Sequence, residues 1–341
     1  MRSRPGFPAA SPFCIGRWLA LITAAILVAG FWPVSPVAAQ EKKAEKKAGN
    51  EKEDEGPSAP EDLVAPTGDG LQLAFTYYPG AKGKETVPVV LLHMWKQSRA
   101  DYKELAPYLQ SQGYAVIVPD LRGHGQSTRL KGVRKDETLN AGNMSPAQFT
   151  MMVTQDMKAI KDFLWERNNA RELNIDKLCV VGAEMGASVA VNFAFADAVE
   201  QDTNRVPRAE YKLGRFVKAL VLLSPERSFR GLPLRAATAY PAVQSDIAVL
   251  ILVGKKNAKA MEEARRIHSI FEKYHPEPTG DDKIDKKTLF LGPLNTSVQG
   301  TKLLDPKLNL NVQAVISDFV NRRLVKSEES KEWTWKERKH R

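Results

Sequence analysis

The chain has 341 residues, of which 43% are hydrophobic and 26% charged, and its formal net charge is +10. This balance is typical of a globular protein and excludes a disordered, collagen-like or disulfide-rich chain. Past residue 40 no apolar run approaches the ~20 residues of a membrane helix, which excludes a polytopic membrane protein. We therefore expect one large folded domain with additional segments at its ends.

Residues 1–39 have the layout of a secretory signal peptide. Three arginines accompany the uncharged apolar stretch 18–32, and the small residues Val37 and Ala39 follow it. Cleavage after Ala39 would release the rest of the chain on the far side of the membrane, and an uncleaved anchor, the alternative, would export it too. We expect a periplasmic or extracellular protein. Its single remaining cysteine, Cys179, is expected to be an inert core residue without a disulfide partner.

Two polar segments flank the predicted domain. Residues 40–66 are rich in Lys, Glu, Ala and Pro, a composition that predicts a disordered charged linker. Residues 326–341 form a basic tail containing Trp333 and Trp335, which we expect to be solvated, the alternative being an anchor at a membrane surface or a partner. The basic body and tail predict at most a weak contact with an anionic surface. The chain shows no basic stripe with interleaved aromatic residues, so nucleic-acid binding is not indicated.

Apolar runs alternate with helical patterns between residues 67 and 325. Strands are predicted at 71–78, 87–93, 114–120, 178–183, 217–224, 247–254 and 287–292. Helices are predicted at 101–112, 147–168, 184–198 and 308–325. Continuous β-branched runs that alternate with helices predict an α/β fold, with a doubly wound, mostly parallel sheet and helices on both faces.

Three stretches of the domain resemble α/β-hydrolases. Residues 89–128 contain the sequence Asp-Leu-Arg-Gly-His-Gly-Gln-Ser at 120–127, which is similar to the superfamily's Asp-x-Arg-Gly-His-Gly-x-Ser. Residues 180–188 resemble the strand–turn–helix nucleophile elbow G-x-S-x-G. Segments within 224–304 resemble the strands and loops that carry the acid and the base. The resemblance, nearest to the dienelactone-hydrolase and serine-aminopeptidase-like branches, implies an α/β-hydrolase-fold domain over 67–325.

The resemblance also implies that the catalytic positions hold residues other than Ser, Asp and His. The nucleophile position is Glu184, the acid position is Asn257 and the base position is Gln299, while Glu226 stands where some relatives place an alternative acid. An Asp can form an ester intermediate at the elbow of some relatives, but Glu is one methylene longer. Gln cannot take up a proton, so the usual base is missing.

The remaining histidines do not supply another base. By the resemblance, His93 and His124 lie in loops where they shape the structure. His268 and His275 are expected to face solvent from the helix after the acid position, and His340 lies in the tail. Because an imidazole normally moves the proton near neutral pH, we expect no serine-hydrolase chemistry.

The backbone of the elbow can persist without the triad. Gly182 and Gly186 are expected to be structural, because the tight turn and the close helix–strand approach leave no room for side chains. The backbone N–H groups of Met94, Trp95 and Met185 are candidates for an oxyanion-type nest. The elbow carboxylate could accept these hydrogen bonds and stabilise the turn. No residue spacing fits a metal site, and no cofactor motif occurs.

These features lead to three hypotheses. We favour an exported, monomeric, non-catalytic homologue, a pseudoenzyme that binds an unknown small ligand or envelope protein through the old pocket or its basic surface. The second is an active esterase- or peptidase-like hydrolase with an unorthodox nucleophile or a base from another loop. The third is a structural envelope protein tethered by residues 40–66. A deep cleft above Glu184 would favour ligand binding or catalysis, and a cleft filled by Met94 and Trp95 a structural or partner role.

Overall fold

The computed structural model describes residues 58–131, 137–203, 208–281 and 283–339. They belong to one compact unit, and the predicted signal peptide lies outside the described residues. Its export function therefore stays a prediction. In the described part of the chain no helix is long and apolar enough to cross a membrane.

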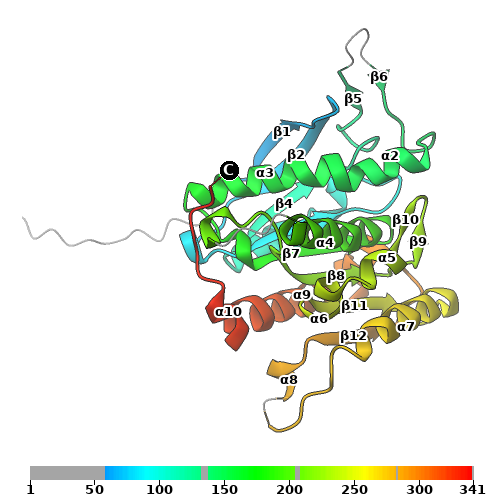
Figure 1. Cartoon of the computed structure of the whole chain (residues 1–341). Coiled ribbons are helices and arrows are strands. Elements are labelled where there is room, and N and C mark those ends of the chain that lie inside the picture. Colours follow the sequence, from blue (N-terminus) through cyan, green and yellow to red (C-terminus); the bar gives the residue numbers. More distant parts are fainter. Residues whose placement is uncertain (1–57, 132–136, 204–207, 282, 340–341) are drawn as a thin grey trace, which may run out of the picture. The chain divides into compact units, whose positions relative to one another are not determined.

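A sheet of eight strands runs through the fold in the order β1-β2-β4-β3-β7-β8-β11-β12 (Figure 1). The strands are β1 (Glu61–Pro66), β2 (Gln72–Tyr78), β3 (Pro88–Leu92), β4 (Ala115–Pro119), β7 (Leu178–Ala183), β8 (Val217–Leu223), β11 (Ala248–Gly254) and β12 (Leu289–Leu294). Strand β2 pairs antiparallel with β1 and β4, and the other neighbours are parallel. Two short ladders stand apart: β5 (Arg129–Leu130) with β6 (Glu137–Thr138), and β9 (Ser228–Phe229) with β10 (Leu232–Pro233).

Helices cover both faces of the sheet, which is why the central strands are apolar along their whole length. The helices are α1 (Leu105–Ser111), α2 (Pro146–Met151), α3 (Met157–Asn169), α4 (Met185–Thr203), α5 (Leu234–Thr238), α6 (Pro241–Ser245), α7 (Ala258–Glu272), α8 (Lys283–Lys286), α9 (Val312–Asn321) and α10 (Glu328–Glu332). Buried residues of α3, α4 and α7 form the core on one face, and those of α1 and α9 form it on the other. The predicted fold class is confirmed.

The sheet begins earlier than the sequence indicated. Residues 61–66 were placed in the disordered linker, but they form β1, paired with β2 from Glu61 opposite Tyr77 to Pro66 opposite Gln72. The prediction was wrong here because β1, with the sequence EDLVAP, is a short and largely exposed edge strand. An edge strand is covered less than a central strand, so its side chains need not form a continuous apolar run. The rest of the predicted linker, residues 40–57, lies outside the described residues.

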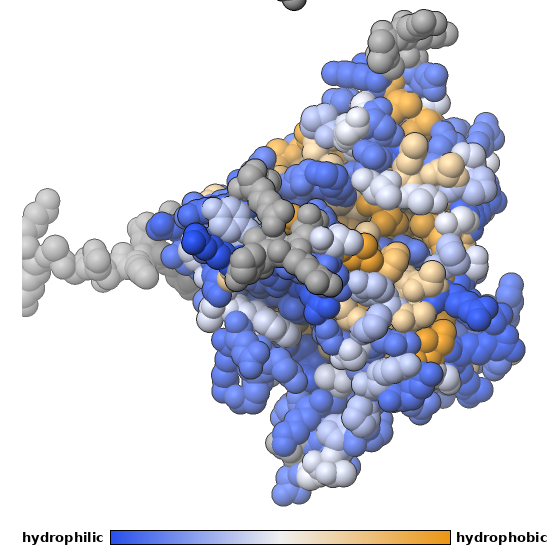
Figure 2. All heavy atoms as spheres, viewed as in Figure 1, coloured by the Kyte–Doolittle hydropathy of each residue, from blue (hydrophilic) through white to orange (hydrophobic). Residues whose placement is uncertain are grey.

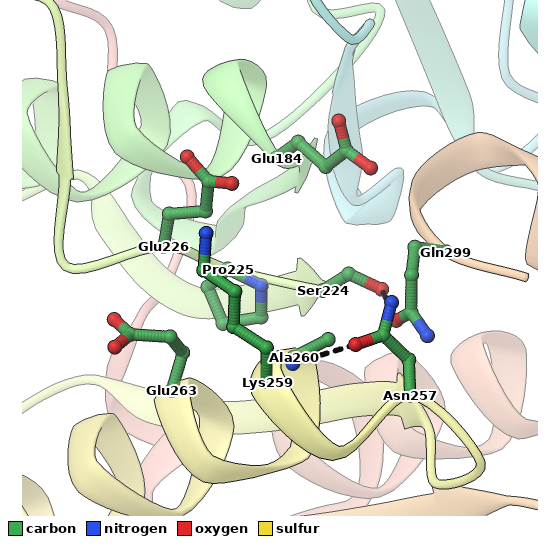
Figure 3. A pocket seen from close by; sticks show the side chains of 9 residues that line it. All are labelled: Glu184, Ser224, Pro225, Glu226, Asn257, Lys259, Ala260, Glu263 and Gln299. Atoms are coloured by element: carbon green, nitrogen blue, oxygen red, sulfur yellow. Dashed lines mark hydrogen bonds between the residues drawn. The ribbon is translucent and has the colours of Figure 1, made fainter. Parts of the chain in front are cut away.

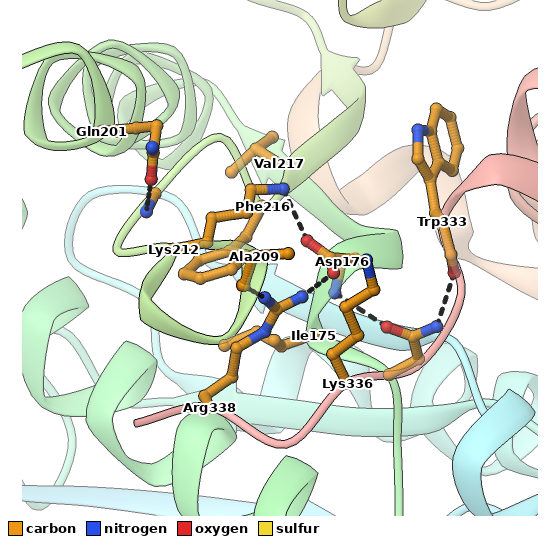
Figure 4. Close-up of polar contacts among 12 residues, drawn as sticks. Ile175, Asp176, Gln201, Ala209, Lys212, Phe216, Val217, Trp333, Lys336 and Arg338 are labelled. Carbon is orange, nitrogen blue, oxygen red and sulfur yellow. Dashed lines mark hydrogen bonds and ion pairs between the residues drawn. The ribbon is translucent and has the colours of Figure 1, made fainter. Parts of the chain in front are cut away.

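The C-terminal segment is docked on the domain, where the sequence favoured a solvated tail. The indole N–H of Trp335 donates to the Asn168 carbonyl at 3.0 Å, and the Asn174 amide donates to the Trp333 carbonyl at 2.8 Å. Arg338 is only 2% exposed and forms an ion pair with a carboxylate of the domain (Figure 4). Asn168 and Asn174 are 167 and 159 residues away in sequence from the tryptophans whose groups they bind, so no local pattern reveals these contacts.

Two glycines let α4 cross close to the sheet. A Cβ atom at Gly186 would clash with the Leu92 carbonyl oxygen of β3, and one at Gly182 would clash with the Gly186 carbonyl oxygen. Both neighbours are backbone atoms, which cannot move aside as a flexible side chain can. The crossing therefore depends on these two positions having no side chain.

We expect Gly186→Ala to lower the free energy of unfolding by about 3 kcal/mol or more, because α4 must move away from β3 to relieve the clash. Denaturant unfolding measures the change. Gly142→Ala is the matched control: this glycine is exposed, and its new Cβ atom would meet only the side-chain oxygen of Asn140 at 3.1 Å. A loss at Gly186 no larger than that at Gly142 would contradict the close crossing.

Candidate functional site

The nucleophile position lies in a sharp turn between β7 and α4. Glu184 occupies this turn with φ 46°, in the left-handed region that non-glycine residues rarely adopt. Its N–H donates to the Leu223 carbonyl at 3.0 Å, and its carbonyl accepts from the N–H of Ala187 at 3.0 Å. The backbone bonds on both sides hold the strained conformation in place. The sharp strand–turn–helix shape expected of the elbow is therefore present, with Glu184 in the turn.

The Glu184 carboxylate is half-buried, and no hydrogen bond to it is recorded among the described residues. Burial raises its pKa, the nearby Glu226 carboxylate raises it further, and Lys302 acts in the opposite direction. The sequence analysis suggested that this carboxylate accepts hydrogen bonds from a backbone nest and stabilises the turn. The raised pKa of Glu184 contradicts this role, because it means that the folded protein disfavours the charged carboxylate.

The residues proposed for the nest lie around the elbow without lining its pocket. Met94 is buried, and its sulfur accepts a weak hydrogen bond from the Thr301 N–H at 3.4 Å. Trp95 is partly buried and donates its indole N–H to the Ala141 carbonyl at 3.2 Å. Met185 is the buried first residue of α4. Met94 thus fills space beside the elbow, whereas Trp95 is fixed to a different loop.

The base position holds an amide that is fully used for structure. The side-chain oxygen of Gln299 accepts the Ser224 hydroxyl at 2.6 Å and the Gly254 N–H at 3.2 Å. Its NH₂ group donates to the Gly254 carbonyl at 2.9 Å. Ser224 in turn accepts the Gly300 N–H at 3.0 Å. Gln299 therefore ties the ends of β8 and β11 to its own loop.

Ser224 was not singled out from the sequence, where it was placed as the last residue of a predicted strand; in the structure it directly follows β8. It has φ 50°, another left-handed conformation, and its hydroxyl links Gln299 and Gly300. The acid position, Asn257, is the N-cap of α7, where its side-chain oxygen accepts the Ala260 N–H at 3.1 Å. This is a common role for Asn at the start of a helix and requires no catalytic function.

The substituted positions meet around one small pocket, which we call the elbow pocket. It has a volume of about 200 Å³. Its lining residues are Glu184, Ser224, Pro225, Glu226, Asn257, Lys259, Ala260, Glu263 and Gln299 (Figure 3). The sequence-derived positions 184, 226, 257 and 299 are thus brought together. Lys259 and Glu263 were missed, because they lie on α7 outside any motif.

Two buried histidines near the elbow are committed to structural hydrogen bonds. The Leu121 N–H donates to Nε2 of His93 at 3.0 Å, so Nδ1 carries the proton and donates to the Met94 carbonyl at 2.7 Å. Burial and the neighbouring His124 lower the pKa of His93 to about 3. His124 is also buried, and its Nδ1 lies 2.9 Å from the Arg122 carbonyl. Neither ring lines the elbow pocket.

The expectation that His275 faces solvent was wrong. It is only 5% exposed, and its ring nitrogens lie 2.8 Å from the Thr288 hydroxyl and 2.8 Å from the Gln244 carbonyl. Its partners come from the chain before β11 and before β12, which the local helical pattern does not show. His268 is partly exposed on α7. Among the described residues, no group of three His, Cys, Asp or Glu side chains could hold a metal ion.

Comparison with known proteins agrees with this geometry. Residues 87–226 match the family described as alpha/beta hydrolase fold. The chain is 32% identical over 117 residues to the soluble epoxide hydrolase of Corynebacterium sp. strain C12, a match covering 33% of this chain and 32% of that protein. The chain thus matches about a third of the length of that curated relative.

Similar solved structures share the fold at low sequence identity. An esterase of Pyrococcus furiosus has a TM-score of 0.52 and 15% identity, with 78% of this chain and 91% of that chain covered. Dienelactone hydrolase from Anabaena variabilis has a TM-score of 0.51 and 13% identity, with 77% and 97% covered. Together with the family match over residues 87–226 and the eight-stranded sheet, they confirm the resemblance at the level of the fold: the chain has the α/β-hydrolase fold.

We expect Glu184→Gln to melt at a higher temperature than the wild type at pH 7. The folded-state pKa of Glu184 is raised, so ionisation costs stability as the pH rises through the unfolded and then the folded pKa. Below about pH 4 the carboxyl is protonated in both states, and the difference should vanish. Melting curves at several pH values measure this.

Glu263→Gln is the matched control with the opposite sign. A hydrogen bond from Arg227 lowers the pKa of Glu263, so this carboxylate stabilises the fold above its unfolded pKa and loses that effect as the pH falls. Its substitution should lower the melting temperature at pH 7. A Glu184→Gln protein that melts below the wild type at pH 7 would contradict our account and restore the stabilising role.

Proposed function

We propose that this chain is an exported, monomeric pseudoenzyme of the α/β-hydrolase fold that binds a small ligand in the elbow pocket. The observation that carries the proposal is Gln299, which stands at the base position and has both polar atoms bonded to Ser224 and Gly254. An amide in this state neither accepts nor delivers a proton. Export rests on the signal-peptide pattern of residues 1–39.

Acyl transfer needs a group that moves a proton between nucleophile, water and leaving group. The described part of the chain brings no imidazole into the elbow pocket, and burial keeps His93 neutral, with its Nε2 accepting the Leu121 N–H. An ester formed on Glu184 would have no imidazole in the elbow pocket to activate the water that hydrolyses it. Binding without turnover is therefore the function that the site supports best.

The charges of the elbow pocket favour a ligand that carries hydrogen-bond donors or a positive charge. Three carboxylates line it, and the Arg227 guanidinium neutralises one of them, that of Glu263, at 2.9 Å. Burial raises the pKa of Glu184, and repulsion from the Glu226 carboxylate raises it further. A small amine between them would relieve this repulsion, with Lys259 limiting the pocket to one such charge.

The face of the molecule shown in Figure 2 gives weaker support to a large protein partner. Hydrophilic side chains dominate the face shown in Figure 2, and the apolar side chains there are interrupted by polar ones. Large protein interfaces usually have a continuous apolar centre. We therefore favour a small ligand, with an envelope protein as the alternative partner.

We expect the purified protein to show no turnover of short- and medium-chain nitrophenyl esters above that of Glu184→Ala. The same protein should gain thermal stability with small primary amines, and Glu184→Gln should lose this gain because the carboxylate that pairs with the amine is gone. Spectrophotometric assays measure the ester turnover, and melting curves measure the stabilisation by amines. Ester turnover that disappears in Glu184→Ala would overturn the pseudoenzyme, and absence of any amine effect would overturn the ligand class.

A second candidate function is hydrolysis with Glu184 as a carboxylate nucleophile. The observation that favours it is the elbow itself: the turn is intact, the carboxylate has no recorded hydrogen bond, and a matched relative is named an epoxide hydrolase. A carboxylate oxygen would attack an epoxide carbon, the ring C–O bond would break, and the freed oxygen would take a proton from water. The product would be a hydroxyalkyl ester of the enzyme.

We expect that a small terminal epoxide leaves no adduct on Glu184, because the described residues of the elbow pocket include no imidazole to assist either step. Intact-protein mass spectrometry followed by peptide mapping measures the addition of one epoxide mass. Glu184→Gln controls for reaction at other side chains. A one-to-one adduct on Glu184 that is absent from the variant would favour the hydrolase over the pseudoenzyme.

A further inference from the structure

A second pocket lies at the amino ends of the strands, opposite the elbow pocket at their carboxyl ends. The elbow pocket lies beyond the carboxyl ends of the strands, where Ser224 follows β8. The second pocket, of about 270 Å³, includes Lys218 near the start of β8 and Ala248 at the start of β11. Glu332 and Trp333 of the C-terminal segment form another wall. The docked C-terminal segment therefore helps to build this pocket, which shares no lining residue with the elbow pocket.

The amine of Lys218 stands in this pocket in an uncommon state. Its side chain is half-buried, and its nitrogen lies 5.2 Å from the centre of the Trp333 ring. Within the described part of the chain it has no recorded hydrogen bond or ion pair. Burial lowers its pKa to about 8. An amine that is covered by an aromatic ring and lacks a carboxylate partner is available as a nucleophile when it loses its proton.

Lys212 shows that a carboxylate partner decides whether a partly buried lysine amine is available to react. Burial lowers the pKa of Lys212 to about 8 as well. Its ammonium group, however, lies 2.6 Å from Oδ1 of Asp176, in the cluster that also binds Arg338 (Figure 4). This pairing occupies the nitrogen and fixes it beneath the C-terminal segment. Lys212 and Lys218 are both partly buried at or just before β8, but only the Lys212 nitrogen is hydrogen-bonded to a carboxylate.

We propose that Lys218 is a reactive amine that condenses with small uncharged aromatic aldehydes entering this second pocket. The Trp333 ring offers a stacking surface for an aromatic group. The exposed carboxylates of Asp246, Glu329 and Glu332 line the pocket and disfavour aldehydes that carry a negative charge. One guanidinium, that of Arg323, lies among them but donates to the backbone carbonyls of residues 285 and 287.

The step balances without an added oxidant or reductant. The lone pair of the neutral Lys218 nitrogen forms a bond to the carbonyl carbon, and the C=O π electrons move to the oxygen. Both hydrogens of the amine leave with that oxygen as water, and the nitrogen and carbon become joined by a double bond. The product is an imine that water can hydrolyse back to the amine and the aldehyde.

The test uses benzaldehyde with the full protein and sodium cyanoborohydride, which delivers hydride to the imine carbon and makes the adduct permanent. Peptide mass spectrometry at pH 8 then gives the rate of labelling at each lysine. At this pH an amine of pKa about 8 is neutral on the order of a hundredfold more often than an ordinary lysine. We expect Lys218 to be labelled at least about tenfold faster than Lys212 and the exposed Lys103.

Three comparisons sharpen the result. Lys218→Arg should lose the fast label, and Lys212→Arg should keep it. Trp333→Ala should slow labelling at Lys218 at pH 8, because the exposed amine holds its proton more tightly. Pyridoxal phosphate, a negatively charged aldehyde, should lose the preference for Lys218. The proposal would be overturned if wild-type Lys218 were labelled no faster than Lys103, or if Lys212 were labelled faster than Lys218. Both outcomes are measured on the wild-type protein, so they do not depend on the folding of a variant.

Discussion

The close crossing of α4 over the sheet is the constraint on which the site depends. Gly186 lies against the Leu92 carbonyl and Gly182 against the Gly186 carbonyl, so the helix can approach only where both side chains are missing. That approach forces the residue between β7 and α4 into a left-handed turn, whatever its side chain is. The geometry that lifts a nucleophile toward a substrate is therefore a property of the backbone packing. It survives with Glu184 in the place of a serine, at the cost of a strained and partly buried carboxylate.

The loop that contains Gln299 also keeps its structure through hydrogen bonds that need no proton-transferring side chain. Gln299 bonds to the Ser224 hydroxyl and to both the N–H and the carbonyl of Gly254, which joins the ends of two neighbouring strands. A histidine at this position would have fewer polar atoms for these partners and would need one nitrogen free for proton transfer. Gln299 instead maximises the number of structural hydrogen bonds. The fold and its likeness to esterases are thus maintained by interactions that do not require turnover.

The sequence predicted the fold and the meeting of positions 184, 226, 257 and 299 because both follow from short-range patterns. Buried parallel strands are continuous apolar runs, and the elbow, strand ends and helix start have characteristic residues at fixed offsets. What could not be predicted depends on distant partners. β1 is a short, largely exposed edge strand that is paired only with β2, and the C-terminal segment is held by Asn168 and Asn174, far away in the chain. His275 is buried for the same reason, since Gln244 and Thr288 bind it across loops.

The two ends of the sheet carry charges of opposite sign that the described residues leave without a partner. At the carboxyl ends of the strands, burial and Glu226 raise the pKa of Glu184. At the other ends, burial lowers the pKa of Lys218. In each case the fold disfavours the charged form, because desolvation is not offset by a partner of opposite charge. Elsewhere the protein pairs its buried charges, as Arg122 with Asp156 and Lys161 with Asp197 show. Glu184 and Lys218 instead line pockets, where a ligand of suitable chemistry could supply the missing interaction, and this is the common physical basis of the two sites that we propose.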